Sequence, residues 1–112
     1  MTITCFIEYR IDPSKHSKFE DYATAWGKII PACGGDLLGY FLPHEGTNNI
    51  AYGLISFASL ADYERYRKRL KDDELGKKNF ELASAENFIF EERRTFLKVV
   101  DDTYMRLAGG IK

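Results

Sequence analysis

Residues 36–62 read DLLGYFLPHEGTNNIAYGLISFASLAD and decide the fold. Two apolar runs, 36–43 and 50–58, flank the polar stretch HEGTNN, whose glycine and asparagines favour a turn. Two such runs joined by a short polar loop predict an antiparallel hairpin. Ser59 followed by Asp62 resembles a capping box, so the spacing predicts that a helix begins directly after the second strand.

The segment before this hairpin predicts a strand and then a long helix. Residues 2–10 alternate between two side-chain faces and are rich in β-branched and aromatic residues, which indicates a strand. Asp12 can cap a following helix, and Pro13 suits its first position because the missing N–H costs nothing there. Apolar residues then recur at helical spacing as far as the glycine pair 34–35. The first helix is therefore predicted over about 13–33.

The segment after the hairpin predicts a helix, a break and a last strand. One face of the helix carries an apolar stripe and the other a basic, solvent-facing surface. The stripe consists of Leu60, Tyr63, Tyr66 and Leu70. The acidic run 72–74 predicts a break or bend before a further helical segment. Residues 88–99, FIFEERRTFLKV, predict the last strand, and a tail of residues 101–112 follows.

The order strand, helix, strand, strand, helix, strand predicts an α+β fold of the ferredoxin-like βαββαβ type, with both helices on one face of an antiparallel sheet. The opposite face is also expected to be apolar. Its predicted side chains include Phe6, Tyr52, Phe90 and Phe96. Both faces of such a sheet need a cover, and one chain has helices for only one face. We therefore expect a domain over 1–100 that forms a homodimer, with the tail 101–112 packing on the partner.

Composition excludes several classes of protein. A chain of 112 residues suits one domain, and 16 Lys and Arg against 17 Asp and Glu give a net charge of −1. That balance argues against a nucleic-acid partner. Cys5 and Cys33 lack the spacing of a metal or redox motif, so we expect two reduced, buried thiols and no metal site. Apolar runs are too short for a signal peptide or membrane span, so no membrane partner and a cytoplasmic location are expected.

Three stretches of the sequence resemble the NIPSNAP family of the dimeric α/β barrel superfamily. They are residues 7–15, IEYRIDPSK; 34–67, GGDLLGYFLPHEGTNNIAYGLISFASLADYERYR; and 91–97, EERRTFL. The likeness covers roughly residues 3–99. It implies that two ferredoxin-like protomers pair through their open sheet faces and that each half of the barrel holds a pocket. Related barrels include cofactor-free oxygenases, haem-handling enzymes and isomerases, so the resemblance does not identify a reaction.

The hairpin carries the first group of candidate site residues. His44 could serve as a base or a haem ligand at a pocket mouth, because neutral imidazole titrates near physiological pH; the alternative is a solvated loop histidine. Asn48, Tyr40 and Tyr52 lie nearby in the sequence. The two tyrosines could donate hydrogen bonds inside a pocket or simply pack in the core. His16, in contrast, is expected to face solvent in the first helical turn.

The charged run in the last strand supplies the second group. Alternation places Glu92 and Arg94 on one face of the strand. Arg94 could reach into the barrel and hold an anionic group, with Glu8 or Glu92 as its partner. The alternative is an ordinary ion pair on an edge strand.

These observations leave three hypotheses of different class. The first is a homodimer of unassigned molecular function that binds a small, partly apolar molecule inside its barrel, without a cofactor. The second is a cofactor-independent or haem-dependent monooxygenase that uses His44, Tyr52 and Arg94. The third is a structural interaction module, which would have no buried pocket.

Overall fold

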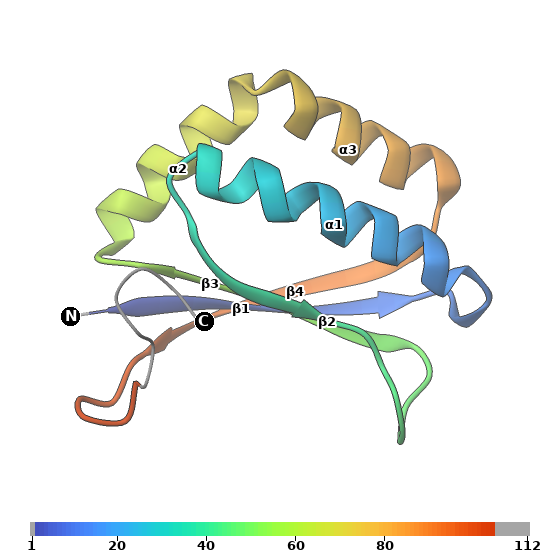
Figure 1. The fold of residues 1–112 in the computed structure, drawn as a ribbon, viewed down its shortest axis with the longest axis horizontal. Helices are drawn as coiled ribbons and strands as arrows, with labels where there is room; N and C mark the ends of the chain where they lie inside the picture. The colour runs from blue at the N-terminus through green and yellow to red at the C-terminus, as the bar shows by residue number, and fades with distance from the viewer. Residues whose placement is uncertain (1, 105–112) are drawn as a thin grey trace.

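The computed structural model describes residues 2–104, and these contain one four-stranded antiparallel sheet in the order β2-β3-β1-β4 (Figure 1). The strands are β1 (Ile3–Ile11), β2 (Asp36–Phe41), β3 (Ile50–Phe57) and β4 (Ile89–Lys98). The helices are α1 (His16–Ala32), α2 (Leu60–Asp72) and α3 (Glu74–Glu86), with a short 3-10 turn at Pro13–Lys15. The predicted ferredoxin-like order is confirmed, and the second helix is divided at Asp73.

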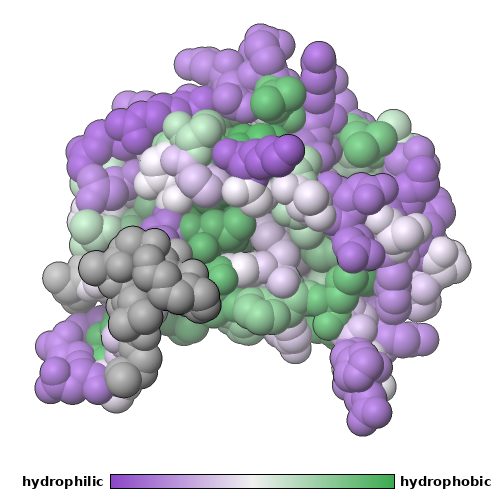
Figure 2. Space-filling view, viewed as in Figure 1, coloured by the Kyte–Doolittle hydropathy of each residue, from purple (hydrophilic) through white to green (hydrophobic). Residues whose placement is uncertain are grey.

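All three helices cover the same face of the sheet, as Figure 1 shows. On β1 the odd-numbered side chains point toward the helices, and Cys5, Ile7, Tyr9 and Ile11 are at most 2% exposed. The α1 stripe packs on them through Phe19, Tyr22, Trp26 and Ile30. In Figure 2, hydrophobic residues gather in the middle of the visible surface, while hydrophilic residues predominate along the helices above.

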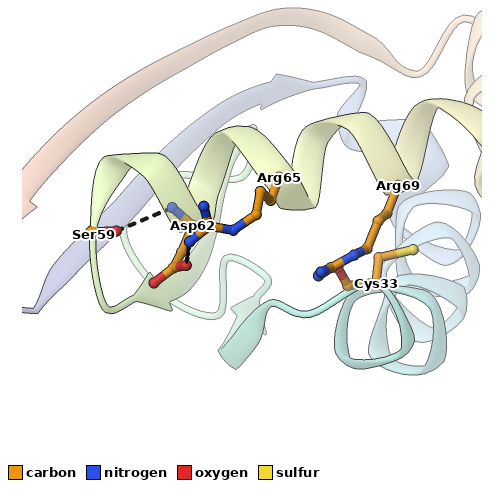
Figure 3. Close-up of polar contacts among 5 residues, drawn as sticks. All are labelled: Cys33, Ser59, Asp62, Arg65 and Arg69. Carbon is orange, nitrogen blue, oxygen red and sulfur yellow. Dashed lines mark hydrogen bonds and ion pairs between the residues drawn. The ribbon is translucent and has the colours of Figure 1, made fainter.

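Two contacts fix α2 at its ends, and Figure 3 draws both. The Ser59 hydroxyl accepts a hydrogen bond from the Asp62 N–H at 3.1 Å, which confirms the predicted cap. Near the other end, Arg69 Nη1 donates to the carbonyl oxygen of Cys33 at 3.3 Å. Gly34 allows this approach, because its φ is +100° and a Cβ there would lie 2.6 Å from Arg69 Nη1. The arginine therefore joins α2 to the end of α1.

Asp73 makes the break between α2 and α3. Its backbone N–H donates to the carbonyl of Leu70, and its side chain accepts from the N–H of Gly76 at 2.8 Å. One residue thus ends α2 and caps α3, as the acidic run predicts. The predicted stripe of α2 is correct at Tyr66 and Leu70, which are buried, but wrong at Leu60, which is 54% exposed because it occupies the first helical turn.

The open face of the sheet, opposite the helices, carries its own set of apolar side chains. Phe6 and Tyr52 stack there with ring centroids 5.5 Å apart, next to Leu54 and Leu97. Phe96, which we expected on this face, lies on the helix-covered face because its Cα pairs with that of Cys5. A β-bulge between Arg10 and Ile11 shifts the register of β4 and brings Ile89 opposite the buried Ile11.

One residue of the predicted tail contacts the sheet of its own chain. The hydroxyls of Thr4 and Ser56 lie 2.8 Å apart, and the Tyr104 hydroxyl lies 3.0 Å from Ser56 Oγ. Both partners belong to the open face. Residues 105–112 lie outside the described part of the chain, so packing of the tail on a partner stays a prediction.

Candidate functional site

A narrow space between the sheet and the helices, which we call the inner crevice, brings together several side chains with polar tips. Its free volume is about 10 Å³, roughly the space that one water molecule needs. Every strand and every helix of the described chain contributes to its walls. They are formed by Ile7, Tyr9, Trp26, Ile30, Tyr40, Ile55, Tyr66, Arg67, Leu70, Phe80 and Arg94.

Two phenols meet at one side of the inner crevice. The hydroxyls of Tyr9 and Tyr40 lie 3.1 Å apart, so one donates to the other and the acceptor keeps a proton for a further partner. The Tyr40 ring lies over Gly53, where a Cβ would come within 2.8 Å of it. Burial raises the pKa of Tyr9 and of Tyr40 well above the ordinary value, and also that of Tyr66. All three phenols are therefore neutral donors at physiological pH.

Trp26 supplies a buried N–H group that lacks an acceptor. Its ring packs edge-on against Phe80, with centroids 4.8 Å apart, and is 3% exposed. Burial raises the pKa of the neighbouring Tyr22 to about 12, and the Trp26 N–H, which lies near the Tyr22 hydroxyl, offsets part of this rise. Nevertheless Trp26 Nε1 has no acceptor in hydrogen-bonding geometry among residues 2–104. A buried donor without a partner costs about 1–3 kcal/mol.

Arg94 brings a positive charge to the same side of the sheet. Its Nε and Nη2 donate to Glu92 Oε2 at 2.8 and 2.6 Å, and its Nη1 donates to the Tyr63 hydroxyl at 3.1 Å. Burial by itself would lower the pKa of Arg94, but the Glu92 carboxylate raises it above the ordinary value. The guanidinium therefore stays charged, with one partner on its own strand and another on α2.

A solvent-open groove lies between α2 and α3, and we call it the α2–α3 groove. It has a volume of about 590 Å³, within the usual range of ligand pockets. It is lined by Arg67, Lys68, Leu70, Lys71, Lys77, Phe80 and Glu81. Arg67, Leu70 and Phe80 also line the inner crevice, so the groove adjoins the crevice and these side chains lie between the two.

The structure brings together only three of the residues that the sequence singled out. Tyr40, Glu92 and Arg94 lie on the helix-covered face. Glu8 and Tyr52 lie on the open face, where their Cα atoms are paired across β1 and β3. Of the two partners considered for Arg94, the structure therefore selects Glu92.

The two loop residues lie apart from both faces. His44 and Asn48 are exposed in the connection between β2 and β3. The backbone oxygen of Asn48 accepts a hydrogen bond from His16 Nε2 at 2.6 Å. His16, which we expected to face solvent, is thus half-buried and fastens the start of α1 to this loop.

Sequence reasoning missed three members of the inner crevice. Tyr9, Trp26 and Tyr66 each occupy a core position in a regular apolar pattern, and the pattern correctly predicts their burial. Each also has a polar tip, which usually needs a hydrogen-bond partner inside a protein. The signal that these three residues share is a polar tip on a side chain predicted to face the core, and it recurs on β1, α1 and α2.

The described residues provide no obvious place for a metal ion. Across residues 2–104, no group of three or more His, Cys, Asp or Glu side chains is arranged to hold one. Both cysteines in this range are buried free thiols. No helix in the same range is long and apolar enough to cross a membrane.

The four-stranded antiparallel sheet with helices on one face defines an α+β protein of the ferredoxin-like class, like the protomers of dimeric α/β barrels. The sequence model of the NIPSNAP family matches residues 4–103. The chain belongs to the NIPSNAP family. Among curated proteins none matches it.

Solved structures share this fold at low sequence identity. A NIPSNAP family protein from Agrobacterium tumefaciens is 23% identical with a TM-score of 0.74, over 95% of this chain and 100% of that one. A second from the same organism, described as having unknown function, is 20% identical with a TM-score of 0.80, over 93% of each chain. A Caulobacter crescentus protein provisionally named an antibiotic biosynthesis monooxygenase is 14% identical with a TM-score of 0.67, over 89% of this chain and 91% of that one.

Proposed function

We propose that this NIPSNAP protein is a homodimer and that each protomer binds a small, partly apolar molecule in the α2–α3 groove, from which one polar atom of the ligand reaches the inner crevice. One observation carries the binding proposal. The buried N–H of Trp26 has no acceptor in hydrogen-bonding geometry among the described residues, and Trp26 lines a crevice that also holds three phenols and adjoins the α2–α3 groove. A ligand oxygen that accepts from this N–H would recover the cost of the unpaired donor.

The open face of the sheet supports the homodimer. Phe6, Tyr52 and Leu54 are only half-buried there, and Leu97 is 43% exposed. Contiguous apolar surface of this kind marks an interaction site on a protein. A second copy of the same face would cover it, and in that arrangement the helix-covered crevices stay separate, one in each protomer.

The geometry favours binding over the monooxygenase alternative. His44 lies in an exposed loop, Tyr52 on the open face and Arg94 on the helix-covered face, so one protomer does not assemble the three residues into a site.

The free thiols of Cys5 and Cys33 suit the reducing cytoplasm in which we place the protein.

The binding proposal can be tested through the single tryptophan of the chain. Trp26 gives one indole N–H peak in a ¹H–¹⁵N spectrum of the labelled protein, and 3-phenylpropionamide serves as a neutral probe. We expect a saturable shift of this peak with a Kd of about 1 mM, typical of roughly 0.3–0.4 kcal/mol for each of about eleven heavy atoms. An indole peak that does not move at saturating probe would overturn the proposal.

Two variants on α1 separate the donor from general packing. Trp26→Phe removes the N–H and leaves a smaller aromatic ring in place, so ligand-detected saturation transfer should show binding weakened about fivefold, the value of one hydrogen bond. Ile30→Val is the matched control, because it removes packing volume from the wall of the inner crevice on the same helix and removes no donor. Equal effects of the two substitutions would contradict a role for the Trp26 donor.

Sedimentation equilibrium tests the homodimer. The wild-type chain should sediment as a dimer, and Leu54→Lys, which places a charge on the open face, should sediment as a folded monomer. Leu82→Lys is the matched control, because Leu82 is an exposed leucine on α3, on the other side of the molecule. A wild-type monomer would show that the open face does not pair.

A further inference from the structure

We infer that the ligand carries an anionic group, which the α2–α3 groove binds while the apolar body of the ligand reaches toward the inner crevice. The ligand class is thus a small, ring-sized molecule with an anionic group at one end and a hydrogen-bond acceptor at the other, such as an aromatic carboxylate with an ether oxygen. This inference rests on the proposed function and adds the charge of the ligand and its direction of entry.

Unpaired positive charge on α2 is the first support. Arg67, Lys68 and Lys71 all line the groove, and within residues 2–104 none of them forms an ion pair. Lys77 faces them from α3 and lies 3.5 Å from Glu74. Like charges three or four residues apart destabilise a helix. The three cations therefore repel one another on the face of α2 that borders the groove.

The other arginines of α2 are used differently, as Figure 3 shows. Arg65 points back to its ion-pair partner Asp62, and Arg69 donates to the carbonyl oxygen of Cys33. Arg65 is therefore paired within the first turns of α2, and Arg69 joins α2 to the end of α1. Arg67 lies between them in sequence and borders both the groove and the inner crevice.

The position of Phe80 gives the direction of entry. Its side chain is 40% exposed, lines the groove on the outside and packs against Trp26 on the inside. The crevice behind it is nearly closed, whereas the groove has room for a ring-sized ligand. A ring that packs on Leu70 and Phe80 would place its anionic group among the cations of α2 and its other end toward the Trp26 N–H.

The test compares 3-(4-methoxyphenyl)propionate with its uncharged isostere 3-(4-methoxyphenyl)propionamide, using the Trp26 indole peak for both; the methoxy oxygen is the acceptor that faces the Trp26 N–H. At low salt the carboxylate should bind about tenfold more tightly, because several partly exposed cations of the groove attract it together. High salt should remove most of this preference and leave the amide unchanged. Equal affinities at low salt would overturn the inference and leave the proposed function intact, whereas an indole peak that responds to neither probe would overturn the proposed function itself.

Charge variants locate the effect. Arg67→Gln/Lys71→Gln should lose most of the preference for the carboxylate and keep the affinity for the amide. The control Arg65→Gln/Lys78→Gln removes the same total charge from α2 and α3 but spares the groove lining, so its preference should remain. Equal loss of both probes in the first variant would also overturn the inference, because charge would not be the cause.

A substitution of opposite sign completes the test. Glu81 is the acidic side chain of the groove lining. Glu81→Gln should tighten binding of the carboxylate about threefold at low salt and leave the amide unchanged. Weaker binding of the carboxylate in this variant would contradict an electrostatic role for the groove.

Discussion

Raising the pH above 10 should unfold this protein through its buried phenols. Four phenols lie between the sheet and the helices: those of Tyr9, Tyr22, Tyr40 and Tyr66. Burial raises the pKa of each above its ordinary value, to about 12 for Tyr22. In an unfolded chain a tyrosine titrates near pH 10. Above that pH the unfolded state releases protons that the folded state retains, so the free energy of unfolding falls as the pH rises.

The size of the loss follows from the number of retained protons. Between about pH 8 and pH 11, one phenol that stays protonated in the folded state and ionises in the unfolded state removes about 1.4 kcal/mol. Four such phenols therefore remove about 5–6 kcal/mol, against a total stability of about 5–15 kcal/mol for a domain of this size. We expect the folded state to be lost between about pH 11 and pH 12.

Urea unfolding at a series of pH values, followed by circular dichroism, measures this loss directly. Tyrosinate absorbance should show the four phenols ionising together with unfolding. Tyr66→Phe removes one of them and should reduce the loss between about pH 8 and pH 11 by about 1.4 kcal/mol. Either of two results would refute the burial of these phenols. One is a free energy of unfolding that is the same at both pH values. The other is tyrosinate formation by these phenols in a chain that keeps its circular dichroism.

Three substitutions test other contacts by thermal and urea unfolding. Gly34→Ala should cost about 2 kcal/mol, because φ is +100° and the new Cβ displaces Arg69; an unchanged melting temperature would contradict this account. Glu92→Gln should cost about 1–2 kcal/mol, because it leaves Arg94 partly buried without its carboxylate; no loss would mean that solvent replaces the pair. Ser59→Ala should cost about 1 kcal/mol as the α2 cap is lost, and a smaller change would show that the cap is redundant.

Local sequence rules predicted the elements because each boundary has a local cause. The turn signals between 36–43 and 50–58 give the hairpin, and Ser59 and Asp73 accept hydrogen bonds from the first turns of α2 and α3. The faces of β4 could not be derived in the same way. Charged and apolar residues occupy both faces of this edge strand, and the bulge beside Ile11 changes its register. That shift is a property of the pairing between two distant segments.

Local sequence patterns could not predict the inner crevice, for a different physical reason. Tyr9, Trp26 and Tyr66 satisfy the core pattern of their own elements, and a phenol or indole ring buries well in a core without any ligand. Their meeting with Arg94 depends on the pairing of β1 with β4, which sets Ile7 opposite Arg94, and on the way α1 and α2 pack across the sheet. Such rings are ordinary core residues when their polar tips find partners inside the protein, as the hydroxyls of Tyr9 and Tyr40 do. The N–H of Trp26 finds none in hydrogen-bonding geometry among residues 2–104, and the proposed binding site rests on this difference, which the burial pattern alone does not provide.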